Sequence, residues 1–246
     1  MSDAVSPSRP PEGAAGAPDA ELSARQAMAT RRSIRAFLPK PVAPAILEEI
    51  LALAAHAPSG SNVQPWQVLV LEGEPLERFG RELHDLYLSG DKGEEEFAYY
   101  PQRWREPYLA RRRKVGWDLY AALGIAKGDT AATAAHQARN FLFFGAPVGL
   151  IFTIDRDLER GSILDYGMFL QNIMIAARGL GLDTCPQAAF IPYWRQIAHR
   201  LAIPDERMLV CGMALGYGDP DAPQNVFPVE REPPSGFMRR VERLAE

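Results

Sequence analysis

The chain of 246 residues has few cysteines, no basic excess and no long hydrophobic run. Its two cysteines, Cys185 and Cys211, are too few for a disulfide framework, so we expect a reducing, cytoplasmic location. The formal net charge of −4 argues against a surface built to neutralise nucleic-acid phosphates. No apolar stretch approaches the length of a membrane span, and prolines interrupt the start of the chain, so neither a membrane helix nor a secretory signal is expected.

Several catalytic chemistries also lack the residues that they need. No two of the four histidines have the spacing of metal ligands on a helix, and neither cysteine has a CxxC partner, so we expect no metal site. A GxSxG motif, a Walker loop and a dinucleotide fingerprint are all absent from the sequence. We therefore expect no side-chain nucleophile of the hydrolase type.

The order of apolar and polar residues predicts an α+β fold. Residues 1–21 are rich in Pro, Ala, Gly and Ser and are predicted to be a disordered tail, and a single domain is expected over residues 22–246. Few strands among many helices favour α+β layers over a long doubly wound sheet. Helices are predicted at 23–30, 44–56 and around 166–177, and strands at 66–71, 148–154 and 209–215.

Residues 90–130 differ in composition from the elements around them. They hold three consecutive glutamates, many aromatic residues and the basic run Arg111–Lys114. Such an excursion between core elements is where a lid over a binding site is expected. The alternative is a solvated pair of helices with the aromatic residues packed beneath it, and the sequence leaves both open.

Two polar segments are candidates for ligand binding. Residues 31–35 place three arginines and a serine together, and guanidinium groups bind phosphate bidentately, so a phosphate monoester would be held well there. The alternative is a solvated basic turn. The loop of residues 58–66 crowds amide and hydroxyl groups ahead of a strand, which suits a ligand with ring heteroatoms, although turn chemistry alone also explains these residues.

Five short segments have a characteristic order and spacing. They are RRSIRAF at 31–37, PSGSNVQPW at 58–66, GLG at 179–181, TCPQA at 184–188 and LGYGD at 215–219, with Arg231 downstream. Together these segments resemble the FMN-dependent nitroreductase family, in its branch of nitroarene and nitrobenzoate reductases. The resemblance spans about residues 22–237 and implies a nitroreductase-like fold with a central mixed β-sheet surrounded by helices. It also implies an intertwined homodimer with FMN at the subunit interface.

The resemblance assigns roles to individual residues. The basic segment and Arg231 would hold the FMN phosphate and ribityl chain, and Arg35 would also stabilise the reduced flavin. The loop of residues 58–64 would complete the site of the partner subunit, and the backbone near Ala188 would face the flavin, although many relatives carry Glu there. Cys185 belongs to a matching segment and is expected at the cofactor, but a lone, commonly buried thiol is not expected to be redox-active. The expected cofactor-binding residues are Arg31, Arg32, Ser33, Arg35, Pro58, Ser59, Gly60, Asn62, Gln64, Cys185, Pro186, Gln187, Ala188 and Arg231.

The implied activity is ping-pong hydride transfer from NADPH or NADH, through FMN, to an aromatic acceptor such as a nitroarene or quinone. The flavin carries the chemistry, so no catalytic side chain is expected. One alternative is reductive dehalogenation of halophenols under a lid that contains Glu94–Glu96, Tyr99 and Lys114. Another is a nucleic-acid module built on Arg111–Lys114, which the acidic composition disfavours. The expected acceptor-binding residues are Tyr99, Tyr100, Trp104 and Tyr108.

Overall fold

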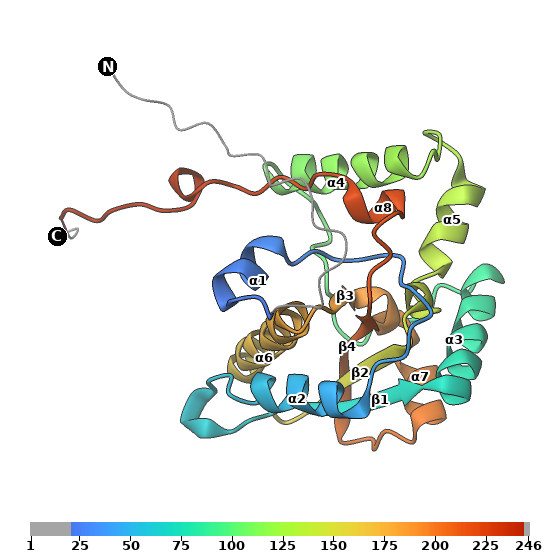
Figure 1. Ribbon diagram of the computed structural model, residues 1–246, viewed down its shortest axis with the longest axis horizontal. Helices are drawn as coiled ribbons and strands as arrows, with labels where there is room; N and C mark the ends of the chain where they lie inside the picture. The colour runs from blue at the N-terminus through green and yellow to red at the C-terminus, as the bar shows by residue number, and fades with distance from the viewer. Residues whose placement is uncertain (1–20, 244–246) are drawn as a thin grey trace.

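The computed structural model describes residues 21–243, so the expected disordered tail over residues 1–21 lies almost wholly outside the described residues (Figure 1). The helices are α1 (Ala24–Thr30), α2 (Pro44–Ala54), α3 (Gly73–Leu88), α4 (Tyr108–Ala122), α5 (Thr130–Ala138), α6 (Arg160–Gly179), α7 (Trp194–Leu201) and α8 (Pro223–Val226). The strands are β1 (Gln67–Glu72), β2 (Val148–Asp155), β3 (Asp183–Gln187) and β4 (Arg207–Gly216). The predicted strands and the three predicted helices are all present, with ends that differ by a few residues.

The sheet has the strand order β1-β2-β4-β3, and each of its three pairings is antiparallel. The expected α+β class is confirmed, but the expectation of a mixed sheet is corrected. Strands β2 and β3 run in the same direction across the α6 crossover, yet β4 lies between them, so they do not pair. The parallel pairing within the described residues is a single bridge from Ser33 to Thr184, on the outer edge of β3.

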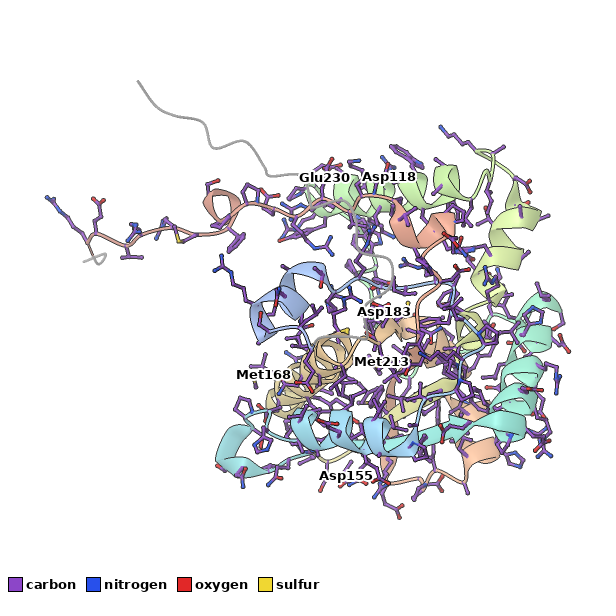
Figure 2. All side chains as sticks on the ribbon, in the orientation of Figure 1. Asp118, Asp155, Met168, Asp183, Met213 and Glu230 are labelled. Atoms are coloured by element: carbon purple, nitrogen blue, oxygen red, sulfur yellow. The ribbon has the colours of Figure 1, made fainter. Side chains whose placement is uncertain are left out.

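Helices cover both faces of the sheet, which explains why β2 is buried along nearly its whole length. Leu150, Phe152 and Ile154 face α2 and α6, because alternate residues of a strand point to the same side. Ile151 points to the other side and joins a cluster with residues of α3, α7 and the 3₁₀ helices η2 (Phe143–Gly145) and η3 (Ala188–Tyr193). In Figure 2, Met213 of β4 lies in the interior between these layers. The sheet is therefore the middle of three layers.

Local signals account for the helices nearest the site. Ser23 caps α1, and Gln26 completes the capping box by bonding back to the cap backbone. Helix α6 buries Tyr166, Phe169, Ile173 and Ala177, whose spacing places them on one face. The tyrosine hydroxyl donates to a backbone carbonyl of β1 or β2. The interior face of α6 thus ties the helix to two strands of the sheet.

The segment of residues 90–130 lies outside this core. Helix α4 has no buried residue, and Trp117 on it is 57% exposed. Tyr108 on the same helix is also exposed, whereas Tyr120 is half-buried against His136. The lid and the solvated pair of helices both stay predictions. Helix α8 and the chain that follows it run alongside α4 (Figure 1). None of the helices within residues 21–243 combines the length and the apolar character that a membrane crossing requires.

Candidate functional site

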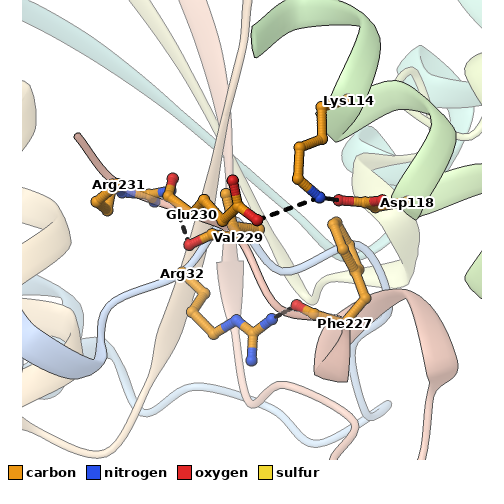
Figure 3. A network of polar contacts seen from close by, with 7 residues as sticks. All are labelled: Arg32, Lys114, Asp118, Phe227, Val229, Glu230 and Arg231. Atoms are coloured by element: carbon orange, nitrogen blue, oxygen red, sulfur yellow. Dashed lines mark hydrogen bonds and ion pairs between the residues drawn. The ribbon is translucent and has the colours of Figure 1, made fainter. Parts of the chain in front are cut away.

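The basic segment near the start of the chain and the segment after α8 meet at one cavity of about 780 Å³. The Arg32 guanidinium donates to the carbonyl of Phe227, and Figure 3 shows this contact beside Arg231. Residues almost 200 positions apart in the chain therefore form one wall. The cavity is lined by Met28, Ala29, Thr30, Arg31, Arg32, Ser33, Arg35, Val115, Gln224, Phe227, Pro228, Val229 and Arg231.

Backbone pairing sets the direction of the basic segment. The Ile34 N–H donates to the Thr184 carbonyl at 3.0 Å, and this contact adds the segment to the free edge of β3. Ile34 is buried in the core, whereas Ser33 and Arg35 on either side of it are half-buried at the cavity. Extended backbone sends alternate side chains to opposite sides, so one anchored isoleucine directs Ser33 and Arg35 the other way.

Asn225 of α8 fixes the other end of the basic segment. Its side-chain oxygen accepts from the Arg35 backbone N–H at 2.7 Å, and its amide donates to the carbonyls of Ala36 and Asp219 at 2.8 and 2.9 Å. Asn225 is only 6% exposed, so these bonds satisfy a buried amide. Sequence reasoning missed this residue. A short Pro-Gln-Asn-Val stretch after the last predicted strand was its only signal.

The cavity concentrates positive charge. Burial lowers the pKa of Arg31 and of Arg32, and the nearby Arg231 lowers both further. No carboxylate lines the cavity, and within residues 21–243 none of these three arginines forms an ion pair with a carboxylate. The adjacent Glu230 pairs instead with Lys114 of α4 at 3.4 Å, and Figure 2 places it beside Asp118 on that helix. The cavity therefore has an uncompensated positive charge that suits a phosphate dianion.

The β3 residues that were expected at the cofactor lie beside the basic segment. Burial raises the pKa of the Cys185 thiol to about 11, although Arg35 and Arg31 are close enough to oppose that rise. The thiol is therefore protonated at neutral pH. Gln187 is buried and its side-chain amide donates to the Asn140 carbonyl at 2.6 Å, while Pro186 is exposed at the strand edge and Ala188 begins η3.

A buried histidine near Arg35 is another residue that sequence reasoning missed. His136 of α5 is 8% exposed, and burial lowers its pKa to about 4, with further contributions from Arg139 and Arg35. The imidazole is therefore neutral at pH 7. No motif surrounds His136 in the sequence, so only its tertiary contacts with Tyr120 and Phe144 reveal it.

The loop of residues 58–64 lies elsewhere on the same chain. It follows α2, and the Gly60 N–H donates to Asp165 of α6 at 3.0 Å. Ser61, Asn62 and Gln64 have φ values of 49°, 60° and 52°, a strained conformation for residues with a side chain. The cavity lining contains no residue of this loop. The structure of one chain therefore does not bring Pro58, Ser59, Gly60, Asn62 and Gln64 to the cavity.

The four expected acceptor-binding aromatic residues lie outside the cavity lining, three of them exposed and Trp104 half-buried. Tyr100 contacts Tyr99 edge-on, with ring centroids 4.7 Å apart, and Trp104 at 5.6 Å. Tyr108 lies apart from them, with Arg105 over its ring at 4.9 Å. Their role toward an acceptor stays a prediction.

Several charged residues expected for the two alternative functions, a dehalogenase and a nucleic-acid module, form ion pairs instead. Of the lid expected for a dehalogenase, Glu94 pairs with Arg195, Glu96 pairs with Arg156, and Lys114 pairs with Asp118 at 2.8 Å. The partners of the two glutamates, Arg195 and Arg156, lie over the same Trp194 ring at 4.4 and 5.5 Å, whereas Lys114 forms its pair on α4. The basic run expected for a nucleic-acid module is half neutralised, because Arg111 also pairs with a carboxylate, that of Glu232.

Comparison with known proteins agrees with this geometry. The model of the nitroreductase family matches residues 28–217. The chain is 43% identical over 210 residues to a 4-nitrobenzoate reductase of Pseudomonas putida, covering 85% of this chain and 92% of that protein. It is 42% identical over 202 residues to a nitrobenzene nitroreductase of Ectopseudomonas oleovorans, covering 82% of this chain and 89% of that protein.

Solved structures give the same result. An FMN and NADPH-dependent nitroreductase from sphigopyxis sp. strain HMH matches with a TM-score of 0.86 and 36% identity, over 90% of this chain and all of that one. An FMN-dependent nitroreductase from Mycobacterium smegmatis, solved in complex with NADPH, matches with a TM-score of 0.84 and 30% identity, over 89% of this chain and 98% of that one. On the family model, the identities and the shared fold, the chain belongs to the nitroreductase family.

Proposed function

We propose that the protein is a homodimeric, FMN-dependent oxidoreductase that reduces nitroarenes with electrons from NADPH or NADH. The observation that carries this proposal is the cavity of about 780 Å³, where arginines from both ends of the chain meet without a carboxylate. The relatives named above include FMN-dependent and NADPH-dependent enzymes. Because the two ends of the chain close one cavity, we also infer a single domain.

The residues present fit a phosphate-bearing cofactor. Arg31, Arg32 and Arg231 would hold the phosphate, because its negative charge would relieve the repulsion that lowers the pKa of the first two. Ser33 lines the same cavity and would donate its hydroxyl beside them. Pro228 and Val229 also line the cavity but carry no charge, so the three arginines would supply the charged contacts to the phosphate.

FMN would supply the redox chemistry, namely acceptance of hydride from a nicotinamide and its transfer to the acceptor. The chain would supply fixed charge and an oriented backbone. Arg35 lies beside Cys185 at the β3 edge and holds a positive charge there, and a fixed charge stabilises negative charge that develops nearby. Gln187 anchors the end of β3 through its buried bond to Asn140, and so orients the backbone from Cys185 to Ala188.

Completion of the site would require a second subunit. The loop of residues 58–64 has exposed polar groups and strained backbone but lies away from the cavity of its own chain. Strained residues of this kind persist where a functional geometry requires them. The C-terminal segment extends away from the core and exposes Phe237, Met238 and Val241 (Figure 1). Exposed apolar residues on an extended segment favour burial against a second copy.

The acceptor would bind near residues 90–130, which we propose as a lid. Tyr99, Tyr100, Trp104 and Tyr108 would then contact the acceptor after movement of this segment or across the dimer. The relatives are a nitrobenzoate reductase and a nitrobenzene reductase at nearly equal identity, so the comparisons favour nitroarenes without choosing between charged and neutral ones. The two buried thiols support a cytoplasmic location.

The visible spectrum of the purified protein tests the proposed function. We expect a yellow protein whose flavin absorbance bleaches when NADPH or NADH is added without oxygen, and returns when nitrobenzene is added. A colourless protein that binds no added FMN would refute the proposal. Bleaching by a nicotinamide without reoxidation by any nitroarene would leave a flavoprotein of another activity and would also contradict it.

A further inference from the structure

A second hollow of about 300 Å³ lies beside the first, against helix α4. The two share Arg35 and Val115 in their walls, so they are neighbours across a common boundary. On the α4 side the second hollow is lined by Arg112, Arg113, Trp117, Leu119 and Tyr120. A molecule that spans the boundary would contact the proposed cofactor cavity at one end and α4 at the other.

Of the four basic residues in the run Arg111–Lys114, the outer two form ion pairs and the inner two line the hollow. Arg111 pairs with Glu232, and Lys114 pairs with Glu230 and Asp118, so these two charges are compensated. Arg112 and Arg113 line the hollow instead, and neither pairs with a carboxylate within residues 21–243. With Arg35 the hollow has three guanidinium groups and no carboxylate in its wall.

Two of these guanidinium groups are held in place by uncharged partners. Arg112 lies over the Trp104 ring at 5.0 Å, and Arg35 donates to the Ser33 carbonyl at 3.2 Å. Cation–π contacts and carbonyl acceptors orient a guanidinium without cancelling its charge. The hollow therefore presents oriented positive charge beside the aromatic rings of Trp117 and Tyr120.

We propose that this hollow binds the carboxylate of the acceptor, so that the enzyme prefers nitro-substituted aromatic acids to neutral nitroarenes. This proposal rests on the proposed function and chooses between charged and neutral nitroarenes, which the comparisons leave open. A guanidinium fork matches the two oxygens of a carboxylate, and the aromatic residues offer faces to the ring that carries it. The shared wall directs the rest of the ring toward the cofactor cavity. Trp104, whose ring lies against Arg112, would in addition orient that guanidinium.

Binding of benzoate to the holoenzyme tests the proposal without turnover, since benzoate has no nitro group. Isothermal titration calorimetry compares benzoate with benzamide, which has the same shape and no charge. We expect benzoate to bind more tightly, and Arg112→Gln and Arg113→Gln each to weaken it about fivefold, the upper range for exposed ion pairs. The matched control is Arg160→Gln, an exposed arginine at the start of α6 that removes the same charge far from the hollow.

Steady-state kinetics on the same proteins provides the second measurement. The ratio of kcat/KM for 4-nitrobenzoate to that for nitrobenzene should fall about fivefold in each hollow variant and stay constant in the control. Flavin content and thermal unfolding show whether each variant is folded. Equal binding of benzoate and benzamide, or an unchanged ratio in both variants, would overturn the proposal.

Other outcomes separate the two proposals. The variants could instead raise KM for NADPH and leave KM for NADH and the ratio of kcat/KM between the two acceptors unchanged. The hollow would then bind the additional phosphate of NADPH, and this inference would be wrong. If the protein reduces nitrobenzene with either nicotinamide but shows no preference for the acid, only this inference fails. If it binds no FMN, the proposed function fails first.

Discussion

Replacement of Arg231 by glutamine tests the phosphate cavity, because the expected effects on the free and the FMN-bound protein have opposite signs. Arg231 is exposed, and within residues 21–243 its side chain donates only to the carbonyls of Val229 and Glu230. Its charge lowers the pKa of Arg31 and Arg32. Without FMN, the substitution removes repulsion. With FMN, it removes a partner of the phosphate.

The magnitudes follow from the exposure of the group. A charge-assisted hydrogen bond contributes about 1.5–3 kcal/mol, and an exposed one lies at the low end, so the Kd for FMN should rise about tenfold. At saturating FMN the linked stabilisation falls by about 1.4 kcal/mol, and a chain of this length then loses about 3–5 °C of its FMN-induced rise in Tm. Relief of repulsion at an exposed site contributes at most about 1 kcal/mol, so the Tm without FMN should stay constant or rise by about 2 °C.

The assay is thermal unfolding with and without FMN, together with FMN titration by fluorescence quenching. Arg239→Gln is the matched control, since Arg239 lies on the same C-terminal segment, is exposed and does not line the cavity. It should leave both Tm values and the Kd unchanged. A fall in the Tm of the FMN-free Arg231→Gln protein with an unchanged Kd would refute the reasoning, since it would show a structural role for Arg231.

Three further predictions concern buried groups. Histidine in an unfolded chain has a pKa near 6.5, whereas burial lowers the pKa of His136 in the folded protein to about 4. Between these two values the unfolded chain binds more protons than the folded protein. The free energy of unfolding therefore falls as the pH falls from 6.5 toward 4. His136→Gln should remove about 2 kcal/mol of this acid sensitivity in urea titrations at pH 7 and pH 4.5, and an equally steep loss in the variant would contradict it. Tyr166→Phe should lower the free energy of unfolding by about 1.5 kcal/mol, because the hydroxyl bonds to backbone groups of Gln67 and Thr153, and an unchanged unfolding midpoint would show that these bonds contribute nothing. Both thiols are buried, with pKa values raised by burial to about 11 for Cys185 and about 12 for Cys211, so a disulfide reagent should label neither until the protein unfolds; fast labelling of the native protein would refute this.

Local residue patterns predicted three of the four strands and three of the eight α-helices within residues 21–243. Ser23 and Gln26 form a capping box within four residues, and the buried face of α6 follows from apolar spacing alone. The basic segment of residues 31–35 was also recognisable, because three guanidinium groups so close together indicate anion binding. The order of the sheet was not predictable, since the position of β4 between β2 and β3 depends on long-range pairing.

The sequence by itself determined which residues can bind a phosphate, while the tertiary structure decided which of them share a cavity. Arg231 joins the basic segment only because α8 and its buried Asn225 turn the chain back toward the β3 edge. The segment after α8 also brings Glu230 and Glu232 to α4, where they form ion pairs with Lys114 and Arg111. Arg112 and Arg113, which lie between those two residues in the sequence, stay without a carboxylate partner within residues 21–243. The charge of a site is the sum over groups that are neighbours in space. Side chains more than a hundred positions apart therefore set it, and no local pattern contains that information.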